Sequence, residues 1–260
     1  MNEFRQYPAP GKLNLMLRVV GRRADGYHLL QTVIRFIDYG DTVGLRVRHD
    51  GRVKRLTEIP GVEAETDLTV KAARLLREAS RCALGVDIAL DKRLPRGGGL
   101  GGGSSDAATA LLALNQLWQL DLPRPRLLEL GLQLGADVPV FVFGDNALAE
   151  GIGELLTPIA APAAWYVVLK PPVAVSTAAV FAARELKRDS KPIRIQGFSV
   201  DLAVNDLEPL VCRLYPEVAR HLQWLRQFGP AMMTGSGACV FAAFASEREA
   251  QAVLARLPDS

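Results

Sequence analysis

The sequence predicts an α+β protein with two lobes, for three reasons. Residues 12–48 alternate apolar and polar side chains with the period of two that is typical of half-buried strands. A further strand, a glycine-rich loop and an apolar helix follow between residues 86 and 118. The second half of the chain then alternates strand-like and helix-like segments. The 260 residues are enough for two lobes that each bury a core.

The N-terminal strands are expected to form antiparallel hairpins. Apolar residues occupy every second position from Leu13 to Val19, so one face of this strand should be buried. Asp25-Gly26 and Asp50-Gly51 are dipeptides that favour hairpin turns. The short basic run at residues 52–55 is then expected on the solvated face of a hairpin. No nucleic-acid partner is predicted.

Two helices and another strand are expected before the end of the first lobe. Asp67, or the threonine before it, can cap a helix whose apolar residues recur at helical spacing as far as Leu76. A second helix is expected at residues 125–134, where a glycine follows. The apolar run at residues 139–143 is expected to be a strand, so that Asp137 lies at a junction between helix and strand.

The expected boundary between the lobes is the segment 157–162, which has two prolines among small residues. Residues 1–157 then form the first lobe and residues 158–260 the second. Residues 187–197 are the most loop-like long stretch of the second lobe. The regular segments expected there are a strand at 165–170, a helix from Ser176 or Thr177 to about Leu186, a helix at 217–228, a strand near Met232, a strand at 240–244 and a terminal helix from Glu247.

A glycine-rich loop lies between the strand that ends near Leu90 and an apolar helix. Six of the nine residues from 97 to 105 are glycines, so backbone N–H groups can approach an anion closely. Ser104 or Ser105 is expected to cap the helix, and Asp106 should favour the positive end of its dipole. A strand, a bare loop and a helix N-terminus together form an anion site, most simply for a nucleotide phosphate.

This loop differs from the common P-loop, because no Lys lies within it and Ser104 follows its last glycine. A catalytic cation must therefore come from elsewhere in the chain. The alternative is a flexible linker or a tight packing turn, but a linker is not expected between a strand and a capped apolar helix. The residues predicted to bind the nucleotide are Pro95, Arg96, Gly97, Gly98, Gly99, Leu100, Gly101, Gly102, Gly103, Ser104 and Ser105.

The composition describes an ordinary globular protein. Hydrophobic residues make up 49% and charged residues 23% of the chain, and the net charge is +3. No segment is long and apolar enough to span a bilayer and no secretory leader is recognised, so we expect a cytoplasmic protein without a membrane partner. Cys82, Cys212 and Cys239 are widely spaced, which predicts reduced thiols and no zinc site. No obligate protein partner is evident.

The pattern Pro-x-Gly-Gly-Gly-Leu-Gly-Gly-Gly-Ser-Ser resembles the phosphate loop of the GHMP small-molecule kinases, the superfamily of galactokinase, homoserine kinase and mevalonate kinase. Over essentially the whole chain, the sequence is similar to the branch that acts on a cytidine diphosphate-linked methylerythritol in the non-mevalonate isoprenoid pathway. It departs from the pattern at Gly11, where the family usually has Ala, and ends at Ser260 before a C-terminal segment that relatives often carry. The segments that carry the resemblance are residues 10–15, 23–28, 134–141, 149–154 and 234–239.

The resemblance implies an ATP-dependent kinase that transfers the γ-phosphoryl group to the C2 hydroxyl of the methylerythritol unit. It also implies the two-lobed GHMP kinase fold, with a ribosomal-S5-like N-terminal lobe and a ferredoxin-like C-terminal lobe. Residues 1–157 would be the ATP-binding lobe, with the glycine loop at 95–105, and residues 158–260 the substrate-side α+β lobe. ATP is the expected co-substrate. Mg²⁺ is expected with it, held mostly by phosphate and water oxygens.

Two residues are the expected catalytic pair. Asp137 would be the general base that takes the proton of the acceptor hydroxyl. Lys12 would stabilise the ionised form of Asp137 and the negative charge on the transferred group. Taken alone, Asp137 would be a turn or cap residue, and Lys12 a surface lysine at a strand end. Together with the glycine loop, the catalytic interpretation is favoured.

The base of the substrate is expected next to the first hairpin turn. In the family, the pair that corresponds to Tyr27 and His28 holds the cytosine, the tyrosine by stacking and the histidine by hydrogen bonding. Phe181 would stack on the other face, although an aromatic residue at an apolar helix position is more often part of a core. Asn14 and Ile152 are weaker substrate-binding candidates. Without the resemblance, His28 would be an ordinary strand residue.

Two other functions stay open at this point. A GHMP kinase of the homoserine or mevalonate type acts on a substrate without a base, so Tyr27, His28 and Phe181 argue against it. A catalytically silent nucleotide-binding protein on the same fold is the second alternative. The presence of both Lys12 and Asp137 argues against a silent protein.

Overall fold

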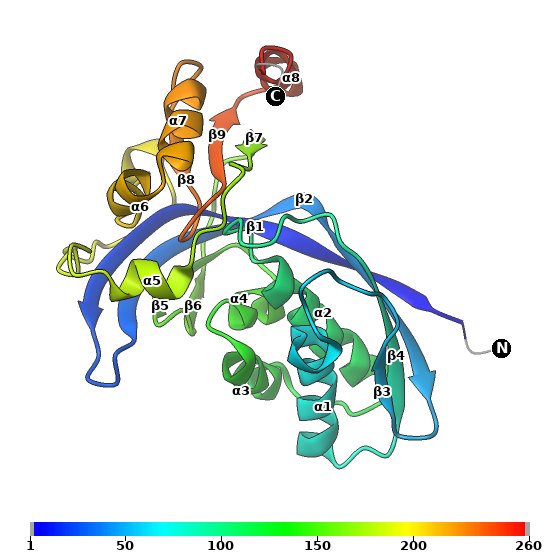
Figure 1. The fold of residues 1–260 in the computed structure, drawn as a ribbon. Helices are drawn as coiled ribbons and strands as arrows, with labels where there is room; N and C mark the ends of the chain where they lie inside the picture. Colours follow the sequence, from blue (N-terminus) through cyan, green and yellow to red (C-terminus); the bar gives the residue numbers. More distant parts are fainter. Residues whose placement is uncertain (1–2, 258–260) are drawn as a thin grey trace.

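Two β-sheets with flanking helices make up the chain, which confirms the predicted α+β class (Figure 1). The computed structural model describes residues 3–257. Within these residues the first sheet has six strands, in the order β3-β4-β2-β5-β6, and β1 pairs with β2. The strands are β1 (Arg5–Arg22), β2 (His28–Arg48), β3 (Val53–Arg55), β4 (Gly85–Asp91), β5 (Ala147–Gly151) and β6 (Leu155–Pro158).

β1 and β2 form a long antiparallel ribbon that arches across the molecule (Figure 1). The turn that joins them contains Asp25-Gly26, as predicted. The pairing register shifts between Pro10 and Lys12 and again between Asn14 and Met16. Such bulges bend a strand and re-aim its side chains. The segment that carries Lys12 and Asn14 therefore has an irregularity in strand pairing on each side.

The second predicted hairpin is wrong. Asp50-Gly51 does follow β2, but β3 does not pair with β2. Instead β4 lies between them, antiparallel to β2 and parallel to β3. The basic run is not wholly solvated either, because the side chain of Arg55 is buried and its Nη1 lies 2.8 Å from Asp67 Oδ2. A turn dipeptide specifies where the chain reverses, but not which strand then comes alongside.

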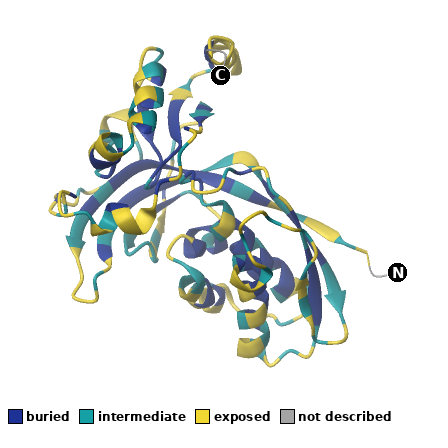
Figure 2. Ribbon diagram, viewed as in Figure 1, coloured by how far each residue is buried: buried dark blue, intermediate teal, exposed yellow. Residues whose placement is uncertain are grey.

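Four helices cover one face of the first sheet and bury a hydrophobic cluster against it (Figure 2). The first begins after Asp67, whose side chain accepts a hydrogen bond from Thr69 N at 2.8 Å, as the capping prediction requires. The second predicted helix, which ends before Gly135, is also present. The helices are α1 (Leu68–Ser80), α2 (Gly102–Leu117), α3 (Arg124–Leu134) and α4 (Val138–Phe143).

The apolar run at residues 139–143 is helical, so the predicted strand is wrong. It forms most of α4, in which Val138 to Val142 are all buried. Pro139 lies in the first turn, where backbone N–H groups have no partner within the helix, so its lack of an N–H breaks no hydrogen bond. Gly144 ends the helix with a φ of 85°. A helix that is buried on all sides has the same apolar composition as a buried strand, so periodicity does not separate the two.

The second sheet has three strands among the described residues, in the order β7-β9-β8. α5 ends at Ala182, earlier than predicted, and α6 was not predicted from the sequence. Residues 187–197 have no regular secondary structure, as expected. No helix within residues 3–257 is long and apolar enough to cross a membrane. The elements are β7 (Trp165–Leu169), α5 (Thr177–Ala182), α6 (Glu208–Leu214), α7 (Pro216–Leu225), β8 (Ala231–Met233), β9 (Val240–Phe244) and α8 (Glu247–Leu254).

Side chains of β1 enter the cores on both sides of the ribbon. Leu17 and Val19 belong to the hydrophobic cluster of the second sheet and its helices. Ala9 belongs to the cluster under α1–α4. The first sheet ends at Pro158 and the second begins at Trp165, so the segment that we expect to separate the lobes runs between the sheets. The division into residues 1–157 and 158–260 stays a prediction.

Candidate active site

The glycine loop has a backbone that residues with side chains rarely adopt. Gly97, Gly99 and Gly101 have φ values of 62°, 76° and 74°, in the left-handed region. Gly101 is the N-cap of α2, and Ser104-Ser105 lies inside the helix. The predicted serine cap is therefore wrong, because the left-handed glycine turns the chain into the helix before the serines are reached.

Hydrogen bonds hold the glycine loop between β1 and the turn that joins β8 to β9. A Cβ on Gly99 would lie 2.2 Å from the carbonyl oxygen of Thr234, so only glycine allows this approach. The position of the loop thus depends on both halves of the chain. The hydrogen bonds are Lys12 N–H to Leu100 O at 2.9 Å, Ala238 N–H to Gly97 O at 3.1 Å and Cys239 N–H to Gly98 O at 3.1 Å.

Lys12 and Asp137 come together beside this loop. Lys12 Nζ lies 3.7 Å from Asp137 Oδ2 and donates a hydrogen bond to Asn14 Oδ1 at 2.6 Å. The side chain of Lys12 is 3% exposed, whereas that of Asp137, at the N-terminus of α4, is 50% exposed. The nearer partner of the ammonium group is thus the neutral Asn14. The carboxylate of Asp137 stays accessible to a further partner.

Asn14 is fixed by contacts with two other elements. Its Nδ2 donates to Thr32 Oγ1 on β2 at 2.9 Å. Its Oδ1 accepts a hydrogen bond from Thr234 Oγ1 at 3.3 Å, and its backbone N–H donates to the same hydroxyl at 3.0 Å. Asn14 lines the pocket described below, but its side chain is buried and largely committed to these contacts. Its geometry suits a residue that orients Lys12.

One pocket brings together most of the residues that the sequence singled out. It is lined by Lys12, Asn14 and Asp137, by residues 95–104, and by Ile152 and Phe181. Ser105 does not line it, because it is fully buried inside α2, and Tyr27 and His28 line the neighbouring pocket described below.

Two hydroxyl residues in this pocket were not predicted from the sequence. Thr177 begins α5, and its Oγ1 lies 2.6 Å from Ser236 Oγ in the turn between β8 and β9. The sequence offered only indirect signals for them: Thr177 was a possible helix start, and Ser236 lies in the segment 234–239, which carries the resemblance.

A buried group of charges lies behind the glycine loop. Lys92 directly follows β4, and its Nζ contacts the carboxylates of Asp41 and Asp106. Burial raises the pKa of Asp106 to about 7, and the attraction of Lys92 offsets this only in part. Asp106 is therefore a partner of Lys92 and not only a helix-dipole residue. Because Lys92 also lines the pocket, it supplies a cation next to a loop that has no Lys of its own.

A second pocket adjoins the first one at the turn between β1 and β2. Its lining includes Tyr27, His28, Ile152 and Phe181, and the last two residues line both pockets. Tyr27 is 59% exposed, while His28 is buried and its ring lies 4.9 Å from that of Phe181. Burial lowers the pKa of His28, which favours its neutral form. The predicted base-binding residues are therefore neighbours, although stacking of a base between Tyr27 and Phe181 stays a prediction.

Comparisons with known proteins agree with this architecture. The GHMP kinases N terminal domain model matches residues 67–145, and the GHMP kinases C terminal model matches residues 190–260. The 4-diphosphocytidyl-2-C-methyl-D-erythritol kinase of Thiobacillus denitrificans is 66% identical over 254 residues, which cover 98% of this chain and 91% of that protein. The kinase of the same name from Dechloromonas aromatica is 62% identical over 253 residues, or 97% of this chain and 92% of its own.

Solved structures give the same result. A crystal structure of 4-(cytidine 5'-diphospho)-2C-methyl-D-erythritol kinase has a TM-score of 0.80 and 34% identity, with 96% of each chain covered. A homoserine kinase from Cytophaga hutchinsonii has a TM-score of 0.70 at 19% identity, over 97% of this chain and 88% of that one, and shares the fold alone. The fold and the family models identify the chain as a GHMP kinase. Within that superfamily, its identity to curated relatives shows that it belongs to the 4-diphosphocytidyl-2-C-methyl-D-erythritol kinases.

Proposed function

We infer that the chain transfers the γ-phosphoryl group of ATP to the C2 hydroxyl of 4-diphosphocytidyl-2-C-methyl-D-erythritol and releases ADP and the 2-phosphate, a step of the non-mevalonate isoprenoid precursor pathway. The observation that carries this inference is the 66% identity, over nearly the whole chain, to a kinase of that name. Homoserine and mevalonate kinases share the fold at 19% and 14% identity, which gives no support to their substrates here.

The phosphates of ATP bind at residues 95–104. Three glycines with left-handed φ values leave the backbone of this loop without side chains that would cover it. The loop also leads into the N-terminus of α2, where backbone N–H groups favour anions. A Cβ on Gly97 would have no atom within 4 Å, so the loop is open on that side and has room for a ligand. Ser105 is left out of this site because it is buried.

Mg²⁺ accompanies ATP in this proposal. Among residues 3–257, no three side chains of His, Cys, Asp or Glu are grouped as a metal site. We propose that phosphate and water oxygens hold most of this ion, as they commonly do for Mg²⁺ in phosphoryl transfer.

Asp137 and Lys12 have the two catalytic roles in the reaction, proton acceptance and stabilisation of charge. Asp137 accepts the proton of the C2 hydroxyl as the bond to phosphorus forms, since its carboxylate is half-exposed and only 3.7 Å from one cation. The ammonium group of Lys12 offsets the negative charge that develops on the transferred group. Asn14 holds that ammonium group in position through its 2.6 Å hydrogen bond.

The cytosine binds in the adjoining pocket. Tyr27 and Phe181 stack on the base, His28 forms hydrogen bonds with it, and Ile152 lies where the two pockets meet. We also propose a cytoplasmic location, which the free thiols of all three cysteines support, since a reducing compartment keeps thiols in that state.

The test is ADP release with four acceptors: the cytidyl substrate, uncytidylated methylerythritol, mevalonate and homoserine. We expect turnover with the cytidyl substrate alone, because only this acceptor fills both pockets. Turnover with mevalonate or homoserine, and none with the cytidyl substrate, would overturn the proposal. ATP binding without ADP release for any acceptor would show a silent protein.

A further inference from the structure

Arg188 lies in the loop after α5, and its hydrogen bonds join that helix to β2. Four of its hydrogen bonds go to carbonyl groups around the C-terminal end of α5, and the fifth goes to the ring of His28. Arg188 thereby links the helix that carries Phe181 to the strand that carries His28. The bonds are Nε–H to His28 Nε2 at 2.9 Å, Nη1–H to Leu186 O at 3.0 Å and Arg184 O at 3.4 Å, and Nη2–H to Phe181 O at 3.0 Å and Ala183 O at 2.6 Å.

The contact with Arg188 determines which nitrogen of His28 carries a proton. A guanidinium group donates hydrogen bonds but cannot accept them, so His28 Nε2 must be the acceptor and is unprotonated. Burial lowers the pKa of His28, and the charges of Arg188 and Arg22 lower it further. A neutral imidazole has one N–H, which must then be at Nδ1. Within residues 3–257, Nδ1 has no hydrogen-bond partner, and His28 lines the proposed base pocket.

An N–H donor in this pocket can distinguish two pyrimidine bases. N3 of cytosine is an acceptor, whereas N3 of uracil carries a hydrogen and is a donor. An N–H donor at His28 Nδ1 can therefore form a hydrogen bond with N3 of cytosine. With uracil, two N–H groups would face each other and this buried hydrogen bond would be lost. In the other tautomer, Nδ1 would be an acceptor and the preference would reverse.

We propose that Arg188 is a positioning residue that holds His28 as the Nδ1–H tautomer and so makes the kinase prefer a cytidyl over a uridyl substrate. This inference rests on the proposed function, because the base belongs to the cytidyl substrate. It adds a residue that does not itself touch the substrate.

The first test needs no substrate. Long-range ¹H–¹⁵N spectra of protein labelled at histidine report which ring nitrogen is protonated, and His28→Gln assigns the signals. We expect Nδ1–H in the wild type and a shift towards Nε2–H in Arg188→Met, which keeps the aliphatic stem and removes every donor. Arg184→Met is the matched control, since it removes an exposed arginine of the same loop whose side chain does not contact His28. Nε2–H in the wild type would overturn the proposal, whether or not the variants fold.

The second test is the ratio of kcat/KM for the cytidyl substrate to kcat/KM for its uridyl analogue. We expect this ratio to fall by roughly tenfold or more in Arg188→Met, mainly through KM, with KM for ATP unchanged. Arg188→Lys should recover part of it, because an ammonium group can still donate to Nε2. A ratio that stays constant while both activities fall would show a purely structural role and overturn the proposal. A wild type that does not phosphorylate the cytidyl substrate would contradict the proposed function, whereas the spectra would still decide whether Arg188 controls His28.

Discussion

The distance between Lys12 and Asp137 is short enough for attraction and too long for a hydrogen bond. At 3.7 Å between Nζ and Oδ2, the carboxylate lies outside hydrogen-bonding distance, while Asn14 takes the close position at 2.6 Å. An amide therefore orients the cation, and the acid is left with free lone pairs. This is the arrangement that a general base requires before its substrate arrives.

Asp137→Asn should lower turnover by roughly a hundredfold or more, because the amide cannot take the proton of the acceptor hydroxyl. ATP affinity should change little, since the glycine loop is unaltered. Single-turnover kinetics and ATP titration measure the two quantities separately. Asp145→Asn, in the exposed turn after α4, is the control and should behave as the wild type. Near-normal turnover in folded Asp137→Asn would remove this residue from the role of base.

Tyr27→Ala and Phe181→Ala should each raise KM for the cytidyl substrate by about ten- to a hundredfold, because stacking of a base on an aromatic ring is worth roughly 1–3 kcal/mol. KM for ATP should stay within about twofold, since the glycine loop is separate from these rings. Tyr39→Ala is the matched control: this tyrosine is also exposed, but lines neither pocket. If all three variants raise KM equally, stacking at Tyr27 and Phe181 is not the cause.

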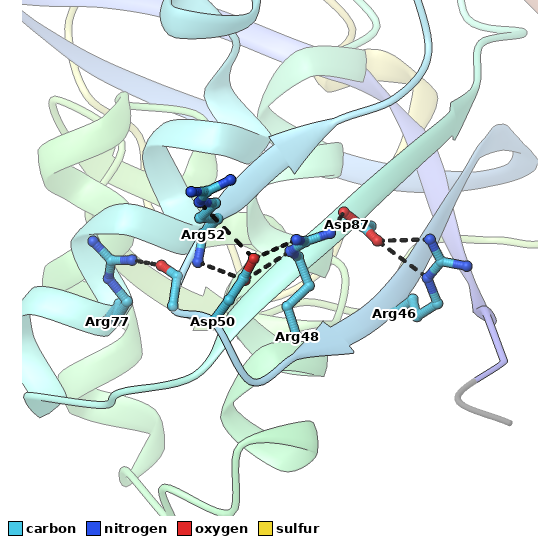
Figure 3. A network of polar contacts seen from close by, with 7 residues as sticks. Arg46, Arg48, Asp50, Arg52, Arg77 and Asp87 are labelled. Atoms are coloured by element: carbon cyan, nitrogen blue, oxygen red, sulfur yellow. Dashed lines mark hydrogen bonds and ion pairs between the residues drawn. The ribbon is translucent and has the colours of Figure 1, made fainter.

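At the scale of elements, β2 and β4 are joined by a buried carboxylate (Figure 3). Asp87 on β4 accepts hydrogen bonds from Arg46 at 2.7 Å and from Arg48 at 2.9 Å, both on β2. Burial by itself raises the pKa of Asp87, but these two arginines outweigh it and the pKa lies below its usual value of 3.8. The charged form of Asp87 thus stabilises the pairing of the two strands.

Asp87→Asn should lower the free energy of unfolding by roughly 1–2 kcal/mol at pH 7, because hydrogen bonds to charged groups are lost. The pKa of Asp87 is lower in the folded state, so its contribution is present above about pH 4 and disappears as pH falls through the folded value. Urea unfolding at pH 7 and pH 3 should therefore show a difference between wild type and variant that shrinks on acidification. Asp91→Asn, an exposed aspartate of the same strand, should show little difference at either pH. A difference that is independent of pH would contradict the assignment to the charged form.

The glycine loop and α2 form the element that carries the phosphate site, and Gly101→Ala tests its geometry. A Cβ at this residue would strain a left-handed φ of 74° and lie 2.8 Å from Phe141 Cζ and 3.2 Å from Lys12 Cγ. We expect the free energy of unfolding to fall by roughly 1 kcal/mol. Turnover should fall at least about tenfold, because Lys12 is displaced. Gly144→Ala shares the left-handed φ, at 85°, and has no such contacts, so it should lose stability only. Equal turnover in the two variants would show that the loop tolerates the added methyl group.

The β1–β2 ribbon runs between the two halves of the molecule (Figure 1), and its side chains make the two sheets interdependent. Leu17 and Val19 are 4% and 0% exposed and fill the core of the second sheet, although they belong to the first. The shape of the pocket also depends on both sheets, because the glycine loop is hydrogen-bonded both to Lys12 and to residues 238–239. Positions in the active site are thus set by contacts between parts of the chain that are far apart in sequence.

Residues 158–260 expressed alone should therefore lack a cooperative unfolding transition, because their core would be open where β1 packs. The full chain should unfold in a single transition that is the same by fluorescence and circular dichroism. Urea titration of both proteins measures this. A sigmoidal transition in the fragment, with dispersed NMR signals, would show that the second lobe folds independently of β1.

Local signals in the sequence determined a large part of the fold. The helices at α1, α3 and α7, the strands β7 and β9 and the strand–loop–helix around the glycines follow from periodicity, capping residues and turn chemistry. Each of these signals acts over a few residues, and so each can be read without knowledge of distant contacts. The same holds for the motifs that indicated a GHMP kinase, because they consist of contiguous residues.

How the distant segments meet does not follow from such local signals. The insertion of β4 between β2 and β3 and the contact of Arg188 with His28 have no local signal. The helical state of residues 139–143 is marked locally only by a proline in its first turn and a glycine at its end, while its apolar run fits a strand equally well. The 3.7 Å approach of Lys12 to Asp137 was expected from the resemblance, yet no spacing in the chain specifies it. Such contacts depend on which apolar faces pack together. A single apolar run can pack against more than one partner, and only the complete core determines which partner it takes.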